Sequence, residues 1–243
     1  MKKILAIAIA LVMLCACTFS VSAAETTLDD IDTGNWWTNL GNVFPVTEDG
    51  VTITFTSTSY ETAVNNWECP AVITFTSDNA VIGGDNYVEY WIHRADNWGW
   101  SAAIGNSPFG DMNSDDTNAD NIAALAAKGI TIDRSFGEGD IWTDVPGYFK
   151  AGVEMTVTAK LVDGNAVVSI SHERITNTIT MPVDISRTTY ICLTGEHCNL
   201  TNVKVSTPDA PDAPPVTGDM AGVVIAMMVA SGAALVVLKK KKF

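Results

Sequence analysis

Short runs in which apolar residues alternate with threonine or serine recur along this chain. In "VTITFT", residues 51–56, the alternation places Val51, Ile53 and Phe55 on one face of a strand. Similar runs occur at residues 71–76, 153–161, 166–171, 188–193 and 200–205. Asp163-Gly164-Asn165 is a turn signal typical of a β-hairpin. The pattern predicts an all-β fold, an antiparallel two-sheet β-sandwich of jelly-roll-like type.

One short helix is expected among the strands, at residues 121–128, with Asp120 as its N-cap. The preceding loop "DMNSDDTNAD", residues 111–120, resembles a calcium-binding loop in its first, third and fifth positions. It departs from that pattern at Asp116, where a glycine is required, and at Ile122, where a carboxylate is required. We therefore expect no cofactor, with a structural Ca²⁺ in an irregular loop as the alternative to a solvated acidic loop.

The N-terminal residues 1–24 have the pattern of a secretory signal peptide. A basic start is followed by the apolar run 4–17 and by the small residues 22–24. The run is too short to favour a membrane span, so cleavage would leave a mature chain beginning near Glu25. "LCAC" also resembles a lipoprotein box, with Cys17 as the lipidated residue.

The C-terminal residues follow a fixed order after the predicted sandwich domain, residues 25–205. Residues 206–217 form a spacer rich in proline and aspartate, which favours an extended conformation. Residues 218–243 contain an apolar run, residues 221–238, about long enough to span a bilayer, and then four lysines. The sequence thus predicts a C-terminal transmembrane helix with a basic cytoplasmic tail.

The motif before this helix resembles the LPxTG cell-wall sorting signal of Gram-positive surface proteins, which a sortase cuts between threonine and glycine. The resemblance implies that Pro215, Thr217 and Gly218 are the sorting residues, and that Thr217 becomes linked to peptidoglycan. The sequence departs from the motif at Pro214, which stands in place of leucine. A plain single-span anchor is the alternative. Either reading predicts an extracellular protein anchored at the cell surface.

The charge of the predicted exported segment, residues 25–217, limits its partners. It holds eight of the fourteen Lys and Arg residues and 27 of the 28 Asp and Glu residues, a net charge of −19. Such a surface excludes nucleic-acid binding, because little could neutralise the phosphates. It also disfavours docking on an anionic membrane, so membrane contact is expected only through the C-terminal span. Neutral ligands such as glycans fit this charge.

The cysteines and histidines give no metal motif. Cys69, Cys192 and Cys198 are an odd number in the mature chain, which allows at most one disulfide. That bridge would join Cys192 to Cys198 or use Cys69. The three histidines are scattered, so metal ligands stay unassigned.

The stretch "EYWIHRADNWGW", residues 89–100, is unusually aromatic. Strand alternation places Val88, Tyr90 and Ile92 in the core. The same alternation turns Glu89, Trp91 and His93 outward or toward a cleft, with burial of Trp91 as the alternative. The last five residues read as a turn.

Six of the seven tryptophans lie between residues 36 and 100, mostly beside Asn or Asp. Aromatic rings can stack on the flat C–H faces of sugars, while polar side chains bond their hydroxyls. One of the adjacent Trp36 and Trp37 should be outside, and Arg94 could instead form a structural ion pair with Asp96 or Glu89. The candidate ligand-binding residues are Trp36, Trp37, Asn66, Trp67, Trp91, Arg94, Asp96, Asn97, Trp98 and Trp100.

The order "NWW … NNWE … YVEYWIHRADNWGW" resembles carbohydrate-binding-type β-sandwich modules in secreted and surface glycan-utilisation proteins of gut bacteria. The resemblance covers roughly residues 34–205 and implies polysaccharide binding without catalysis.

Two other functions are alternatives. One is a protein-binding adhesin or assembly component, for which the sandwich is only a scaffold. The other is a glycoside hydrolase, since "EGDIW", residues 138–142, resembles the carboxylate strand of laminarinase-type glycosidases. Its third carboxylate is missing, and no pair of catalytic carboxylates can be nominated.

Overall fold

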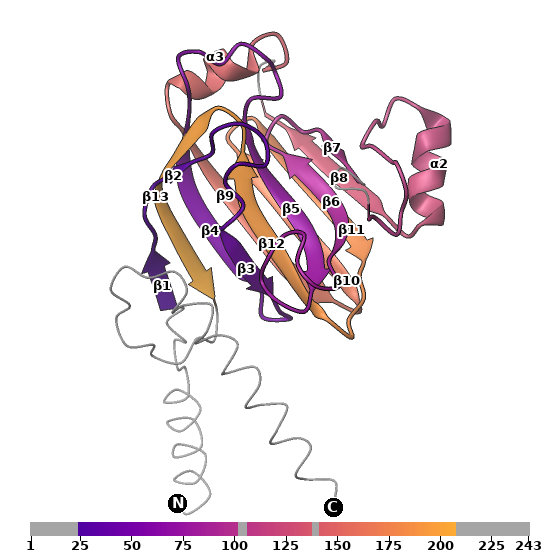
Figure 1. Ribbon diagram of the computed structural model, residues 1–243. Coiled ribbons are helices and arrows are strands. Elements are labelled where there is room, and N and C mark those ends of the chain that lie inside the picture. Colours follow the sequence, from indigo (N-terminus) through magenta and orange to yellow (C-terminus); the bar gives the residue numbers. More distant parts are fainter. Residues whose placement is uncertain (1–23, 102–105, 138–140, 208–243) are drawn as a thin grey trace, which may run out of the picture.

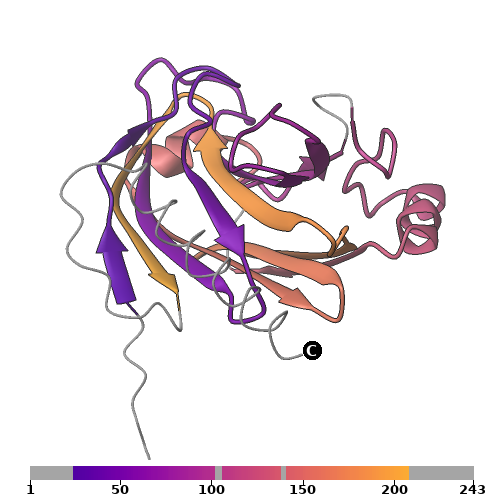
Figure 2. The ribbon, with the colours of Figure 1, turned by 60° about the horizontal axis from the view of Figure 1, so that its bottom comes forward.

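The computed structural model describes residues 24–101, 106–137 and 141–207, which form two antiparallel β-sheets packed face to face (Figures 1 and 2). Sheet A contains β1 (Ala24–Thr27), β2 (Ile31–Asp32), β4 (Val51–Ser59), β8 (Thr131–Phe136), β9 (Val153–Val162), β10 (Asn165–His172), β11 (Ile175–Pro182) and β13 (Cys198–Thr207). Its order is β1-β13-β4-β9-β10-β11-β8, with β2 also paired to β13. Sheet B contains β3 (Val43–Val46), β5 (Pro70–Ser77), β6 (Val88–Arg94), β7 (Gly99–Trp100) and β12 (Thr188–Gly195), in the order β3-β12-β5-β6-β7. The all-β, two-sheet antiparallel architecture is confirmed.

Sheet A follows the alternation of the sequence. In β4 every second side chain is buried, and Val51, Ile53 and Phe55 lie in the core as predicted. The turn between β9 and β10 has positive φ at both Asp163 (49°) and Gly164 (79°). These angles are those of a two-residue hairpin turn, which explains why the Asp-Gly signal located it correctly.

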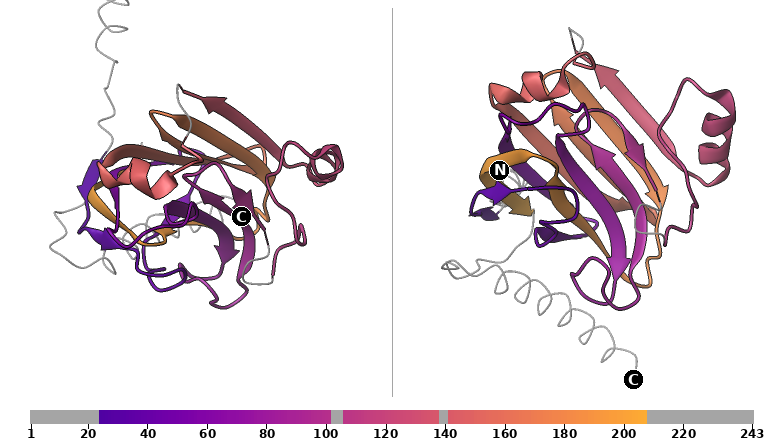
Figure 3. Two further views of the ribbon diagram at one scale, coloured as in Figure 1. Left: turned by 90° about the horizontal axis from the view of Figure 1, so that it is seen from above. Right: turned by 45° about the horizontal axis from the view of Figure 1, so that its top comes forward.

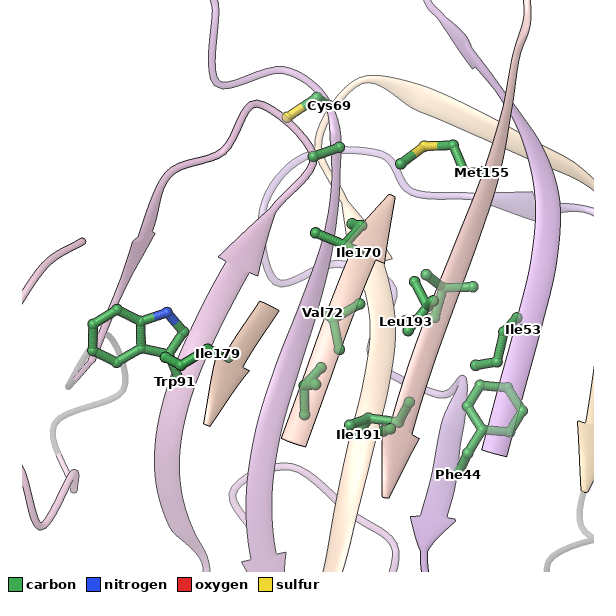
Figure 4. Close-up of a cluster of buried hydrophobic side chains, with 14 of the residues drawn as sticks. Phe44, Ile53, Cys69, Val72, Trp91, Met155, Ile170, Ile179, Ile191 and Leu193 are labelled. Atoms are coloured by element: carbon green, nitrogen blue, oxygen red, sulfur yellow. The ribbon is translucent and has the colours of Figure 1, made fainter. Parts of the chain in front are cut away.

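The main core lies between the two sheets (Figure 4). It joins Ile53 and Met155 of sheet A to Val72, Ile191 and Leu193 of sheet B. Trp91 extends this core at the β6 side and is only 1% exposed. A tryptophan buried to that degree stabilises the fold, and its removal typically costs about 3–5 kcal/mol.

A second apolar cluster lies on the other face of sheet B. Ile73, Phe75, Ile92 and Tyr190 are buried there, together with Ala71, Val43, Tyr87 and Cys192. Several partly buried residues pack on this cluster: Trp36, Leu40 and Ile82 from loops, and Trp100 from β7. Consequently β5 is buried along its whole length on both faces.

A β-bulge in β6 overturns part of the sequence prediction. Thr74 pairs with Trp91 and Phe75 pairs with Glu89, which leaves Tyr90 as the extra residue. Beyond the bulge the faces exchange, so Trp91 enters the core between the sheets and Ile92 enters the outer cluster. Trp91 is thus buried, which is the alternative left open for it. Glu89 and His93 are buried as well, so the expected exposure of these two residues is wrong.

Among the described residues, two helices accompany the sheets, where one was predicted within the sandwich (Figures 1 and 3). Helix α2 (Ala119–Ala127) has Asn118 as its N-cap, whose side chain accepts from the backbone N–H groups of Asp120 and Asn121, so the prediction of Asp120 was wrong. Helix α3 (Val145–Lys150) covers one end of the sandwich, and Asp144 caps it by accepting from Gly147 N at 2.8 Å.

Cys69, Cys192 and Cys198 are free, buried thiols. Cys192 belongs to the outer cluster and Cys198 to the core between the sheets, which explains why these two are not joined. Burial raises the pKa of both to about 12.

The two ends of the chain, including the signal peptide and the sorting residues Pro215, Thr217 and Gly218, lie outside the described residues. Within the described ranges, no helix combines the length and apolar character needed to cross a bilayer.

Candidate functional site

Four loops meet at the end of the sandwich that carries α3 (Figure 1). They are residues 33–42, residues 60–69, the β6–β7 turn at residues 95–98, and the two-residue β12–β13 turn. Backbone bonds join three of them: His197 N donates to Gly34 O at 2.7 Å, Tyr60 N to His197 O at 2.8 Å, and Glu196 N to Cys69 O at 3.2 Å. The β6–β7 turn is bonded next to them, since Ala95 N donates to Pro70 O at 2.8 Å. The loops therefore form one connected surface built on strand ends.

Three tryptophans form an aromatic cluster on this surface, which we call the tryptophan platform: Trp36, Trp37 and Trp100. The ring centroids of Trp36 and Trp37 are 5.6 Å apart, and those of Trp36 and Trp100 are 5.9 Å apart in an edge-on arrangement. Trp37 is 38% exposed, and the other two are partly buried against the outer cluster of sheet B. The three rings are therefore packed against one another, and each keeps part of its surface accessible to solvent.

Arg94 joins the platform to the β6–β7 turn. Its guanidinium lies 5.4 Å from the centroid of the Trp100 ring, a cation–π contact. It also forms a bidentate ion pair with Asp96, with Nε donating to Oδ1 at 3.0 Å. Asp96 Oδ1 accepts from the backbone N–H of Trp98 as well. Of the two expected partners, Arg94 therefore pairs with Asp96, and the same group also contacts the platform.

Glu68, Glu196 and His197 form a polar cluster in contact with Asn35 of the loop at residues 33–42, which we call the acid–histidine cluster. One ring nitrogen of His197 and one carboxylate oxygen of each glutamate lie within 4.8 Å of one another. His197 Nδ1 is 2.5 Å from Glu68 Oε1, and Nε2 is 2.7 Å from Asn35 Oδ1. Glu68 Oε2 accepts from the backbone N–H groups of Val64 and Asn65.

The two glutamates of this cluster have pKa values shifted in opposite directions. Desolvation is the largest influence on Glu68, but bonds from the Asn65 backbone and His197 outweigh it and lower its pKa. Desolvation raises the pKa of Glu196; Glu68 adds to this rise, while His197 and Arg94 oppose it. Glu196 Oε2 is buried and has no hydrogen-bond partner among the described residues.

Several predicted site residues are not placed to touch a ligand. Trp91, Asp96 and Asn97 are buried, and Asn97 adopts a left-handed conformation (φ 72°) whose backbone oxygen accepts from Asn177 Nδ2 at 3.4 Å. Burial leaves these three a structural role. Trp98 is partly exposed beside them.

Asn66 and Trp67 lie in the loop at residues 60–69, toward α3. The Asn66 side chain donates to Trp142 O and accepts from Val145 N at 3.3 Å, so it anchors the loop to the start of α3. Trp67 and Trp142 are 46% and 40% exposed. Neither ring takes part in the contacts among Trp36, Trp37 and Trp100.

Sequence reasoning missed the acid–histidine cluster. Glu68 and His197 are 129 residues apart, and no motif links them. The one local signal is the turn itself, where His197 adopts a left-handed conformation (φ 47°) that glycine or asparagine would adopt more easily.

Several oxygen atoms of the acidic loop at residues 111–120 already have hydrogen-bond or ion-pair partners in the protein. Asn121 Nδ2 donates to the backbone oxygens of Asn113 and Asp115, and Asp116 forms an ion pair with Arg134 at 2.5 Å. Asp115 accepts from the backbone and hydroxyl of Thr117. These contacts fit a self-bonded loop. Glu138 and Asp140 of the "EGDIW" motif lie outside the described residues.

Comparison with known proteins gives no family: no family model matches the chain, and no curated protein matches it. Among solved structures, the Ca²⁺/Man-bound VIP36 exoplasmic/lumenal domain aligns at 8% identity over 71% of this chain and 72% of that chain, with a TM-score of 0.31. Its Ca²⁺/Man3GlcNAc-bound form aligns at 10% identity, 70% and 73% coverage, and a TM-score of 0.24. Peanut lectin with a nine-residue peptide aligns at 9% identity, 78% and 93% coverage, and a TM-score of 0.22. Scores this low do not establish a common fold, so function is inferred from this chain's own residues.

Proposed function

We propose that this protein binds polysaccharide without cleaving it, through the tryptophan platform of Trp36, Trp37 and Trp100. The observation that carries the proposal is the gathering of these rings, from the loop at residues 33–42 and from β7, into one partly exposed cluster. A preformed aromatic surface offers stacking area at little conformational cost, because two torsions fix each ring. Arg94, held by Asp96 against Trp100, supplies hydrogen-bond donors beside it.

The charge of the chain favours a neutral glycan as the ligand. Residues 25–217 carry a net charge of −19, which repels polyanions such as nucleic acids and acidic polysaccharides. Neutral sugars carry no such penalty. The ligand class we infer is therefore a neutral polysaccharide or oligosaccharide.

The terminal sequences support display of this site at the cell surface. We infer export by the signal peptide, residues 1–24, and anchoring through the sequence that follows the sandwich. In the sortase reading, Thr217 is joined to peptidoglycan, and residues 206–217 hold the domain away from the wall. The domain then resembles a jelly-roll-like carbohydrate-binding module of a gut-bacterial surface protein, and captures glycan near the cell.

A glycoside hydrolase is the second candidate, because two carboxylates with oppositely shifted pKa values are typical of an acid and base pair. The limited access of a substrate to these two carboxylates argues against hydrolysis. Glu68 is 3% exposed, and Glu196 Oε2 is buried, so a glycosidic oxygen cannot reach both groups in this arrangement. We therefore expect no release of reducing ends from any polysaccharide that the protein binds.

Affinity-gel electrophoresis against a panel of soluble polysaccharides, with pull-down on insoluble ones, tests the proposal. We expect retardation on at least one neutral glycan, and at least about tenfold weaker binding for Trp37→Ala and Trp100→Ala, a loss of about 1.4 kcal/mol. Trp37 is the more exposed of the two and its loss should disturb folding less.

Trp142→Ala is the matched control, because Trp142 is similarly exposed (40%) and lies outside the platform. It should bind like the unaltered protein. No retardation on any glycan would refute glycan binding and leave the adhesin alternative. Equal binding by Trp37→Ala, Trp100→Ala and the unaltered protein would refute the platform as the site.

A further inference from the structure

We propose that Glu68, Glu196 and His197 bind a divalent transition-metal ion, with Zn²⁺ as the best match. Zn²⁺ takes both imidazole nitrogen and carboxylate oxygen as ligands, and the imidazole favours a transition metal over Ca²⁺ or Mg²⁺. The three donor atoms come from the loop at residues 60–69 and from the β12–β13 turn, which β5 and β12 hold side by side. This proposal does not depend on glycan binding.

The spacing of the donor atoms fits one ion after a small adjustment. All three lie within 4.8 Å of one another, whereas two atoms bound to the same Zn²⁺ are at most about 4.3 Å apart. The closest pair, His197 Nδ1 and Glu68 Oε1 at 2.5 Å, must open to about 3.4 Å. Glu196 and His197 are partly exposed side chains, so shifts of this size need no change in the strands.

The hydrogen bonds around the cluster orient its donors as those around a metal site do. Asn35 Oδ1 can only accept, so His197 Nε2 carries a proton and donates to it at 2.7 Å. His197 Nδ1 then faces Glu68 Oε1 at 2.5 Å, a distance at which a proton joins the two atoms. A divalent cation that displaced this proton would lie between the same two donors. The other oxygen of Glu68 is fixed by two backbone N–H groups, as ligating carboxylates usually are.

Charge and burial point to a cation as well. The two carboxylates carry two negative charges, and the nearby Arg94 is already neutralised by Asp96. Glu196 Oε2 is buried with no hydrogen-bond partner among the described residues, an arrangement that is costly without a bound cation or proton. A divalent ion would neutralise the cluster. Three protein ligands would leave one Zn²⁺ position for water.

Isothermal titration of the metal-free, full-length protein with ZnCl₂ tests the site, with MnCl₂ and CaCl₂ titrated separately. We expect one Zn²⁺ per chain and at least about a hundredfold weaker binding for Glu196→Gln. Asn35→Ala, which removes the bond that orients His197, should weaken binding about 10–100-fold. Glu61→Gln is the matched control, since Glu61 is an exposed carboxylate in the same loop.

Thermal unfolding separates a lost metal site from a lost fold. Without metal, Glu196→Gln should be about as stable as the unaltered protein, because it removes the repulsion between Glu196 and Glu68 and keeps the size of a partly exposed side chain. With Zn²⁺, only the unaltered protein and Glu61→Gln should gain stability. No Zn²⁺ binding at millimolar concentration, tighter binding of Ca²⁺ than Zn²⁺, or equal Zn²⁺ affinity in Glu196→Gln would overturn the proposal.

Discussion

Replacing Arg94 with methionine should destabilise this protein much more than loss of a surface charge would. Asp96 is 2% exposed, and its carboxylate is bonded to the Arg94 guanidinium through two nitrogen–oxygen contacts. Removal of one partner from a buried ion pair leaves an uncompensated charge, which typically costs about 3–5 kcal/mol. Methionine keeps much of the apolar stem of Arg94, so most of this loss is electrostatic.

Urea denaturation at pH 7 measures the loss, and Arg94→Met/Asp96→Asn is the control. The double variant has no buried charge at this place, and the amide oxygen that replaces the Asp96 carboxylate can still accept from the Trp98 backbone. It should recover most of the stability lost in Arg94→Met, because replacing both partners of a buried pair is often nearly neutral. We expect a coupling energy of at least about 2 kcal/mol between the two positions.

The pH dependence of Arg94→Met gives a second readout. Desolvation already raises the pKa of Asp96, and Arg94 opposes the rise, so the pKa rises further when Arg94 is removed. A carboxyl whose folded-state pKa exceeds its unfolded value favours folding at low pH and loses that contribution as pH rises through the folded-state pKa. The deficit of Arg94→Met should therefore shrink as the pH falls below 7. A loss under about 1 kcal/mol, as for exposed pairs, or additive effects of the two changes would refute this reasoning.

Two further changes test the support behind the platform. Gly99→Ala should lower stability by about 1–3 kcal/mol in thermal denaturation and should weaken glycan binding. The reason is that an added Cβ would overlap the Trp91 ring and lie 2.9 Å from Ile92 O. Unchanged stability would contradict this packing. Desolvation lowers the pKa of His93 to about 4. As the pH falls below about 6.5, His93 of the unfolded chain is therefore protonated before His93 of the folded chain. The free energy of unfolding should consequently fall by about 3 kcal/mol between pH 6.5 and 4. Urea denaturation at several pH values measures this fall, and most of it should be absent in His93→Leu. A smaller fall should remain because burial also lowers the pKa of His172.

Four strands of sheet A, β4, β9, β10 and β13, could be predicted from the sequence because each buries one face, whereas β8 and β11 of the same sheet were not predicted. In β4 and β9 this leaves a clear alternation, and the Asp163-Gly164 turn marks the hairpin. The strands of sheet B show a weaker alternation of apolar and polar residues, because loops cover the outer face of this sheet and β5 is buried on both sides. Alternation then cannot tell which face of the sheet meets the other sheet.

The bulge in β6 limited what could be said of the candidate site. A period of two assigns Trp91 to the same face as Glu89, whereas the extra residue at Tyr90 moves Trp91 into the core. A bulge has no reliable sequence signal here, because it is set by packing against β5. The acid–histidine cluster was inaccessible to sequence reasoning for a similar reason, since only the pairing of β5 with β12 brings Glu68 and His197 together.

The stretch at residues 89–100 therefore has two linked roles. Trp91 is a core residue, and its ring lies so close to Gly99 that no side chain fits between them. This contact holds β7 against β6, where Ile92 pairs with Trp100. Arg94, fixed by Asp96, then contacts the exposed side of the same strand pair at Trp100. The buried Trp91 thus positions the partly exposed Trp100, so the stability of the core and the geometry of the platform should change together when this stretch is altered.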